Sequence, residues 1–135
     1  MFTWPVRVYY EDTDLGGVVY YANYLRFLER ARTEWLRSLG CDQTELLEQR
    51  GLLFMITGVE IRYRKPARFN DRLCVTAELA RRRRVSMRFS QTIYQDDIQQ
   101  ERLVDASVDA ACVEAASLSP RPIPEELLAA MERDR

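Results

Sequence analysis

The sequence has 135 residues, so we expect one domain, over residues 1–135, with a single hydrophobic core. Its 20 basic and 21 acidic side chains give a net charge of -1, which provides no overall field to attract nucleic acid or an anionic membrane. The absence of histidine excludes Ser-His-Asp and Cys-His catalysis, histidine-ligated metals and histidine general bases.

The three cysteines, Cys41, Cys74 and Cys112, are odd in number and widely spaced. Without histidine nearby, this spacing indicates buried thiols in a reducing compartment rather than disulfides or a zinc site. The first residues, "MFTWPVRVYY", lack the basic and apolar regions of a signal peptide. These features predict a cytoplasmic protein.

The first half of the chain reads as one strand and two helices. Alternating apolar residues predict a strand over 5–12 that begins at its proline. After "TDLGG" the apolar period changes to about 3.6, which predicts a long helix over 21–39 that ends at Gly40. Its predicted apolar face consists of Tyr24, Leu28, Ala31, Trp35 and Leu39. The segment "DQTELLEQRG" predicts a short second helix closed by Gly51.

The second half reads mainly as strands. Strand-like runs lie at about 52–66, 72–82, 84–95 and 101–115. Gly58 leaves open whether the first run is continuous, and "NDR" and "QDD" are turn signals between later runs. After "SPRPIP", the segment "PEELLAAMERDR" predicts a terminal helix. One long helix among consecutive antiparallel strands is typical of an α+β fold in which the sheet wraps around that helix.

The segment "EDTDLGG" places three acidic residues before the long helix. The first N–H groups of a helix are unpaired and stabilise an anionic oxygen, and Gly16 and Gly17 allow a substrate to approach the backbone. Asp14 can face the same space, so a carboxylate would lie beside an oxyanion site. Capping and Asx turns are the more common use of aspartate in such a turn.

Residues 7–37, "RVYYEDTDLGGVVYYANYLRFLERARTEWLR", resemble the hotdog-fold 4-hydroxybenzoyl-CoA thioesterase family. They are most similar to its YbgC branch of acyl-CoA thioesterases, which is associated with the Tol-Pal system. The shared features include the Thr-Asp pair, Gly17, the double valine, the double tyrosine and "NY". Weaker similarity continues through "YRKPARFNDRL" and "SPRPIP".

This resemblance implies a five-stranded antiparallel sheet around one long helix, and a homodimer that commonly pairs into a homotetramer. It also implies that Asp14 is the catalytic nucleophile or general base, that the Tyr21 backbone N–H polarises the thioester carbonyl, and that Gly17 makes room for the acyl group. No metal or dissociable cofactor is implied, because coenzyme A is part of the substrate. The roles of Glu11 and Asp12 stay open.

Tyr21 departs from the YbgC branch, which usually has histidine at this position, whereas the hydroxybenzoyl-CoA enzymes tend to have tyrosine. The backbone N–H is the same in either residue, so the oxyanion role is unaffected. A role for the histidine side chain is excluded. The acyl preference of the branch therefore does not transfer directly.

Candidate substrate-binding residues are Tyr20, Tyr24, Arg84 and Arg121. Arg84 belongs to the run "RRRR" at 81–84, and such arginines could hold the phosphates of coenzyme A or the acidic surface of an acyl carrier protein. A solvated hairpin that discourages edge pairing is the alternative. Aromatic residues at helical spacing, Tyr24 among them, are most often core.

Three hypotheses on function follow. The first is hydrolysis of short- to medium-chain acyl-CoA or acyl-carrier-protein thioesters. The second is a narrower aryl-CoA thioesterase, which Tyr21 favours. The third is a module that binds acyl carrier protein without catalysis. A hotdog dehydratase is disfavoured, since those enzymes resemble one another in a catalytic histidine that this chain lacks.

Overall fold

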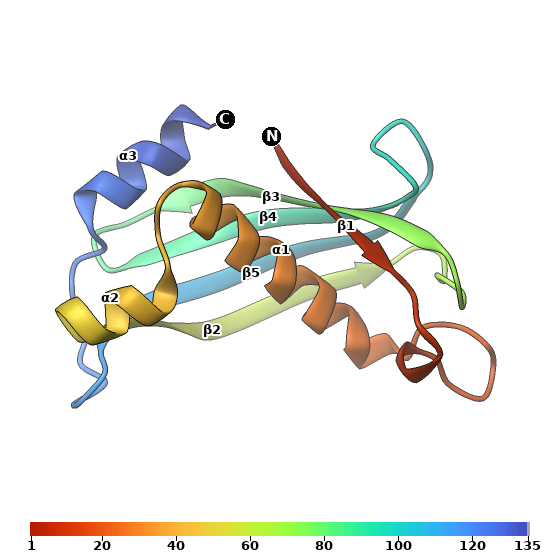
Figure 1. Cartoon of the computed structure of the whole chain (residues 1–135), viewed down its shortest axis with the longest axis horizontal. Coiled ribbons are helices and arrows are strands. Elements are labelled where there is room, and N and C mark those ends of the chain that lie inside the picture. The colour runs from red at the N-terminus through yellow and green to blue at the C-terminus, as the bar shows by residue number, and fades with distance from the viewer. Residues whose placement is uncertain (135) are drawn as a thin grey trace.

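The computed structural model describes residues 1–134, and the last residue of the predicted terminal helix lies outside this range. Five antiparallel strands form one sheet in the order β1-β3-β4-β5-β2. The strands are β1 (Phe2–Arg7), β2 (Leu52–Tyr63), β3 (Arg72–Arg82), β4 (Ser86–Gln95) and β5 (Arg102–Glu114). The long helix α1 (Tyr24–Ser38) lies across one face of the sheet (Figure 1). The predicted hotdog arrangement is confirmed.

The helix ends follow the capping residues of the sequence. A single turn of 3-10 helix, Tyr21–Asn23, leads into α1, and Gly40 follows it with a φ of 89°. The Asp42 side chain accepts hydrogen bonds from the first turn of α2 (Gln43–Arg50). Gly51 closes α2 in the left-handed conformation, as predicted.

The prediction of a strand over 5–12 was wrong at both ends. β1 starts at Phe2, and Pro5 lies inside the strand, opposite Cys74. Proline is tolerated there because β1 is an edge strand. The chain leaves the sheet after Arg7 because Asp12 bonds back to Tyr9 and folds Tyr10–Asp12 into a 3-10 turn.

The remaining strands lie close to their predictions. β2 is continuous, with a register shift between Ile56 and Gly58, and it ends at Tyr63 rather than at 66. Asn70 and Asp96 adopt positive φ angles in the two predicted turns. Val104, Ala106, Val108, Ala110 and Cys112 alternate along β5 and are buried.

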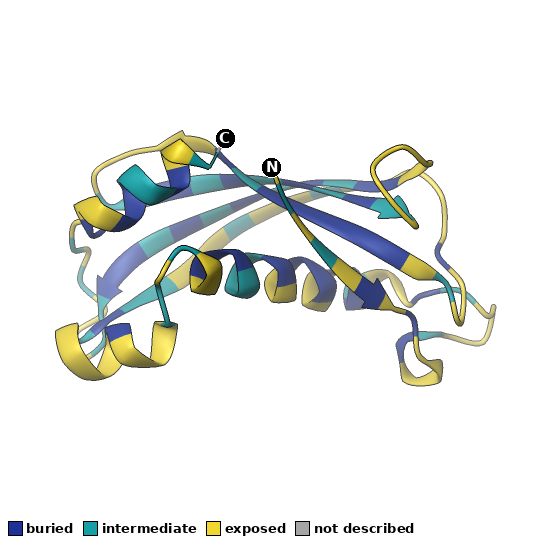
Figure 2. Cartoon of the chain, turned by 45° about the horizontal axis from the view of Figure 1, so that its top comes forward, coloured by how far each residue is buried: buried dark blue, intermediate teal, exposed yellow. Residues whose placement is uncertain are grey.

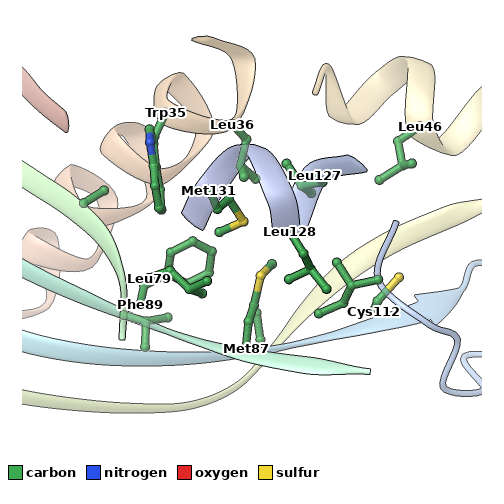
Figure 3. Close-up of a cluster of buried hydrophobic side chains, with 14 of the residues drawn as sticks. Trp35, Leu36, Leu46, Leu79, Met87, Phe89, Cys112, Leu127, Leu128 and Met131 are labelled. Atoms are coloured by element: carbon green, nitrogen blue, oxygen red, sulfur yellow. The ribbon is translucent and has the colours of Figure 1, made fainter. Parts of the chain in front are cut away.

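The core between helix and sheet consists of two hydrophobic clusters. One contains Phe27, Leu28 and Ala31 of α1, and the other contains Trp35 and Leu36. Figure 2 shows the buried residues of α1 recurring along the helix on one side. Figure 3 shows the second cluster, with Trp35 and Leu36 on the helix side and Phe89 on the sheet side. Burial of each large side chain contributes about 1.5–3 kcal/mol to the free energy of unfolding.

The terminal helix α3 (Glu125–Arg133) covers one end of the second cluster. Its residues Leu127, Leu128 and Met131 are buried against the sheet. Just beyond it, the Asp134 carboxylate accepts a hydrogen bond of 2.7 Å from the Trp35 indole N–H. This bond satisfies the only polar atom of a side chain that is 1% exposed.

All three cysteines are free thiols. Cys74 and Cys112 are buried and Cys41 is half-buried. Burial raises the pKa of each thiol, which lowers the fraction of reactive thiolate at neutral pH. No helix within residues 1–134 has both the length and the apolar character that crossing a bilayer requires.

Candidate active site

The loop between β1 and the first helical turn is held by Asp14 at both its backbone and its side chain. The Asp14 N–H donates to the Val18 carbonyl at 2.9 Å, and the Gly17 N–H donates to the Asp14 carbonyl at 3.0 Å. Asp14 Oδ1 also accepts from the Gly16 N–H at 2.8 Å. Asp14 therefore forms the Asx turn that the sequence also allowed. The second carboxylate oxygen of this exposed residue has no hydrogen-bond partner within residues 1–134, so it can contact a substrate or a water molecule.

Gly17 supports the same loop with a φ of 74°, a conformation that side chains with a Cβ rarely adopt. A Cβ added at this position would have no heavy atom within 4 Å. The open space next to Gly17 agrees with its predicted role of leaving room for an acyl group, which stays a prediction.

We expect Gly17→Ala to lower the free energy of unfolding by about 1–2 kcal/mol, since the left-handed backbone is strained for alanine. The cost comes from the backbone alone, because the added methyl group meets no neighbour. Urea denaturation measures it. Gly17→Asn is the control and should lose less, since asparagine tolerates this conformation; equal stability of Gly17→Ala and wild type would contradict the expectation.

Asp12 and Glu11 differ from Asp14 in their surroundings. The buried Asp12 carboxylate accepts from the Tyr9 N–H and from Asn23 Nδ2, each at 2.8 Å, and its carbonyl accepts from the Tyr20 N–H at 2.9 Å. Asp12 thus ties the start of the helix to the end of β1. Glu11 is exposed.

The start of the helical segment offers unpaired N–H groups. The Asn23 N–H donates to the Tyr20 carbonyl at 2.8 Å, whereas the amides of Tyr21 and Ala22 have no acceptor within residues 1–134. Such groups can donate to an oxygen that becomes anionic during a reaction. The Tyr21 amide is therefore free to donate to a thioester carbonyl, as its predicted role requires.

Two hollows lie beside these groups. The first, of about 340 Å³, is lined by Glu11, Thr13, Asp14, Tyr20, Ala22, Asn23 and Arg26. It brings the Asp14 carboxylate and Tyr20 together with the start of the helix. The second, of about 260 Å³, includes Tyr21 and Tyr24 but neither Asp14 nor Gly17. Nothing in the spacing of Arg26 in the sequence indicated that it would line the first hollow.

Four tyrosines form a cluster, of which Tyr21, Tyr24 and Tyr63 line the second hollow and Tyr20 lines the first. Ring centroids are 4.9 Å apart for Tyr20 and Tyr21, 6.3 Å for Tyr21 and Tyr63, and 5.5 Å for Tyr24 and Tyr63. The neighbouring Tyr21 phenol raises the pKa of Tyr20. Tyr63 was missed in the sequence, although strand alternation places it on the face that looks toward the helix. Its hydroxyl donates to the Tyr21 carbonyl at 3.0 Å, a contact that does not involve the Tyr21 N–H.

Tyr24 belongs mainly to the core, with 3% of its surface exposed. Its hydroxyl accepts from the Ala67 N–H at 3.0 Å. Burial raises the pKa of this phenol, and the carboxylates of Asp71 and Asp14 add to the effect. Its substrate-binding role stays a prediction, since only part of it borders the hollow.

Arg84 follows β3 and Arg121 follows β5, and these strand ends lie at the end of the sheet opposite the one where the Asp14 loop leaves β1 (Figure 1). The eleven residues of β3, which separate the two ends, span roughly 35 Å. Arg84 is exposed, whereas Arg121 donates to Glu114 at 2.9 Å and to the Pro120 carbonyl at 3.0 Å. Within one chain these arginines do not join the candidate site. Across residues 1–134 no three acidic or cysteine side chains are grouped to hold a metal ion.

Known proteins resemble this chain over almost its whole length. The acyl-CoA thioesterase YbgC of Haemophilus influenzae is 43% identical over 129 residues, which cover 96% of this chain and 93% of that protein. The 1,4-dihydroxy-2-naphthoyl-CoA hydrolase of Thermosynechococcus vestitus is 34% identical over 89% of this chain and 81% of that protein.

A solved structure of a probable thioesterase from Bartonella henselae aligns with a TM-score of 0.84 and 34% identity, covering 90% of this chain and 98% of that one. The family model of the thioesterase-like superfamily matches residues 8–131. These residues include the Asp14 loop, the free helix amides and every strand of the sheet except β1. The chain belongs to the thioesterase-like superfamily.

Proposed function

We propose that this protein hydrolyses acyl-CoA thioesters, with Asp14 as the reacting carboxylate. The observation that carries the proposal is one carboxylate with a free oxygen beside a helix start with two free amides, in a chain of the thioesterase-like superfamily. The YbgC relatives are named acyl-CoA thioesterases, which supports acyl-CoA as the substrate class. No cofactor beyond the coenzyme A of the substrate takes part in this proposal.

In the proposed reaction, the Tyr21 N–H donates to the thioester oxygen and stabilises the charge that develops there. Asp14 then acts in one of two ways. As a nucleophile it forms a mixed anhydride while the coenzyme A thiolate leaves, and water hydrolyses the anhydride. As a general base it takes a proton from the attacking water and delivers it to the leaving thiolate. Gly17 leaves room for the acyl group in either case.

The acyl group is proposed to be a short to medium aliphatic chain. The tyrosine cluster of Tyr20, Tyr21, Tyr24 and Tyr63 specifically favours an aryl group as the second candidate, because aromatic rings pack well on aromatic side chains. The hydrolase of a naphthoyl-CoA among the relatives supports the same alternative.

Turnover of acetyl-, hexanoyl-, palmitoyl- and benzoyl-CoA tests these proposals. We expect hexanoyl-CoA to have a kcat/KM at least about tenfold above palmitoyl-CoA and benzoyl-CoA, which corresponds to about 1.4 kcal/mol of preferential transition-state binding. A preference for benzoyl-CoA would establish the aryl alternative. Salt-sensitive binding of acyl carrier protein without any thioester cleavage would instead favour the non-catalytic module.

We further propose a homodimer formed through the edge strand β2, with dimers pairing into a tetramer. β2 exposes Met55, Ile56 and Val59 along an unpaired edge, which is the kind of surface that another strand covers. A second subunit could also bring arginines such as Arg84 to a site they do not reach within one chain. We also propose that the protein is located in the cytosol, where thiols stay reduced, and that it is associated with the Tol-Pal system.

Val59→Lys should weaken the dimer at least about tenfold, because a charge on the β2 edge opposes strand pairing. Sedimentation equilibrium measures the dissociation constant. The matched control is Thr3→Lys on β1, the other edge strand, which should leave it unchanged. Equal effects of the two substitutions would place the interface elsewhere.

A further inference from the structure

The chain has a single lysine, and it lies beside the candidate active site. Its 20 basic side chains are 19 arginines and Lys65. Lys65 follows the end of β2, at the end of the molecule where the loop after β1 also lies (Figure 1). It lines the second hollow, of about 260 Å³, together with Tyr21, Tyr24 and Tyr63. The only side-chain amine of the protein is therefore at the hollow that Tyr21, with its free N–H, also lines.

The backbone holds Lys65 in a defined position at this hollow. The N–H groups of Arg64 and Lys65 both donate to the Leu103 carbonyl, at 2.8 and 3.2 Å. Pro66 follows, lines the same hollow, and restricts the backbone of the residue before it. From this fixed start, the flexible four-carbon stem of the lysine can turn its amine toward the hollow or away from it.

The amine of Lys65 is paired with Glu101 at the surface. The two side chains are 59% and 54% exposed, and an ion pair this exposed is weak. The amine therefore leaves Glu101 and returns to it readily. The neighbouring Arg64, which pairs with Asp105, is no substitute, because a guanidinium keeps its proton in proteins and is not a nucleophile.

We propose that Lys65 is acylated by the acyl-CoA substrate. The inference rests on the proposed function, since the thioester must bind with its oxygen at the Tyr21 N–H. The ammonium first gives one proton to water, and the neutral nitrogen attacks the thioester carbon. The N–C bond forms, the C–S bond breaks, and the coenzyme A thiolate takes up the second proton that the nitrogen loses. The product is an amide, which resists hydrolysis far more than a thioester does.

Binding of the thioester gives this reaction its selectivity. Lysine amines as a class carry a proton at pH 8 far more often than α-amines do, so without binding the α-amine of a chain reacts first. A lysine held beside a bound thioester gains a much higher effective concentration. A preference for Lys65 over the α-amine of the exposed Met1 would therefore report a thioester bound next to Lys65.

Peptide mass spectrometry after incubation with hexanoyl-CoA at pH 8 measures acylation of both amines in the same molecule. We expect Lys65 to be acylated at least about tenfold faster than the α-amine of Met1. Hexanoic anhydride, which needs no binding site, should modify the α-amine first. Asp14→Asn should be acylated by hexanoyl-CoA faster than wild type, because a thioester that is not hydrolysed stays bound for longer.

Variants of the ion pair test the role of the amine. Glu101→Gln should raise the rate of Lys65 acylation by about two- to fivefold, the range that release from a surface ion pair allows. Glu48→Gln, at an exposed acid of α2, is the matched control and should leave the rate unchanged. Lys65→Arg should keep wild-type turnover of hexanoyl-CoA and lose the modification.

The same experiments separate this proposal from the proposed hydrolysis. Turnover of hexanoyl-CoA without selective modification of Lys65 would overturn the acylation alone. Selective modification without turnover would support the acylation and overturn the hydrolysis. An α-amine that reacts with hexanoyl-CoA as fast as Lys65 would show that no thioester is bound beside the lysine, and would also overturn the acylation.

Discussion

Asp14→Asn should lower kcat for acyl-CoA hydrolysis by roughly 10² to 10⁴, the range typical of losing a general base or nucleophile. The melting temperature should change little, because the asparagine Oδ1 can still accept from the Gly16 N–H and keep the loop closed. Stopped assays of free thiol release measure the rate, and thermal unfolding measures the stability.

Asp97→Asn is the matched control for this experiment. Asp97 is also exposed, and its Oδ1 accepts from the N–H two residues later, that of Gln99, at 2.7 Å. The two substitutions thus make the same chemical change in the same kind of turn, in different loops. We expect Asp97→Asn to retain wild-type turnover. Retained turnover in Asp14→Asn would remove Asp14 from the reaction.

Asp12→Ala should have the opposite effect, with a loss of about 2–4 kcal/mol in the free energy of unfolding. The substitution leaves the Tyr9 N–H and the Asn23 amide without their acceptor, and each buried unsatisfied donor costs about 1–3 kcal/mol. Urea denaturation followed by circular dichroism measures the loss.

Glu11→Ala, at the exposed neighbouring acid, should stay within about 0.5 kcal/mol of wild type. If both variants were equally stable, the hydrogen bonds of Asp12 would not be what ties β1 to the helix. Together the two experiments separate one acid that acts on a substrate from another that maintains the fold.

Most of the fold could be predicted because it depends on local patterns. Apolar period, glycine stops and turn residues placed α1, α2 and the four later strands within a few residues. The end of β1 could not be predicted, since "VRVYYED" continues the alternation of a strand. The Asp12 side chain overrides that pattern through a partner, Asn23, that is eleven residues away in the chain.

The candidate site was predicted less completely, for the same physical reason. Asp14, Gly17 and Tyr21 lie in one contiguous motif, so the sequence shows them together. Tyr63 acts through Tyr21, which lies 42 residues away in the chain, and no short spacing reveals such a contact. The family resemblance selected Asp14 among three acidic residues. The structure shows that Asp12 instead accepts hydrogen bonds that tie β1 to the start of the helix.

The bond between Trp35 and Asp134 ties the residue that follows α3 to the buried core. Removal of the last two residues would leave the indole N–H without its acceptor and loosen the packing of α3. An affinity tag before Met1, which is exposed, leaves this bond untouched. In a Trp4→Phe variant, Trp35 would be the sole tryptophan, and its fluorescence would report on whether α3 is docked.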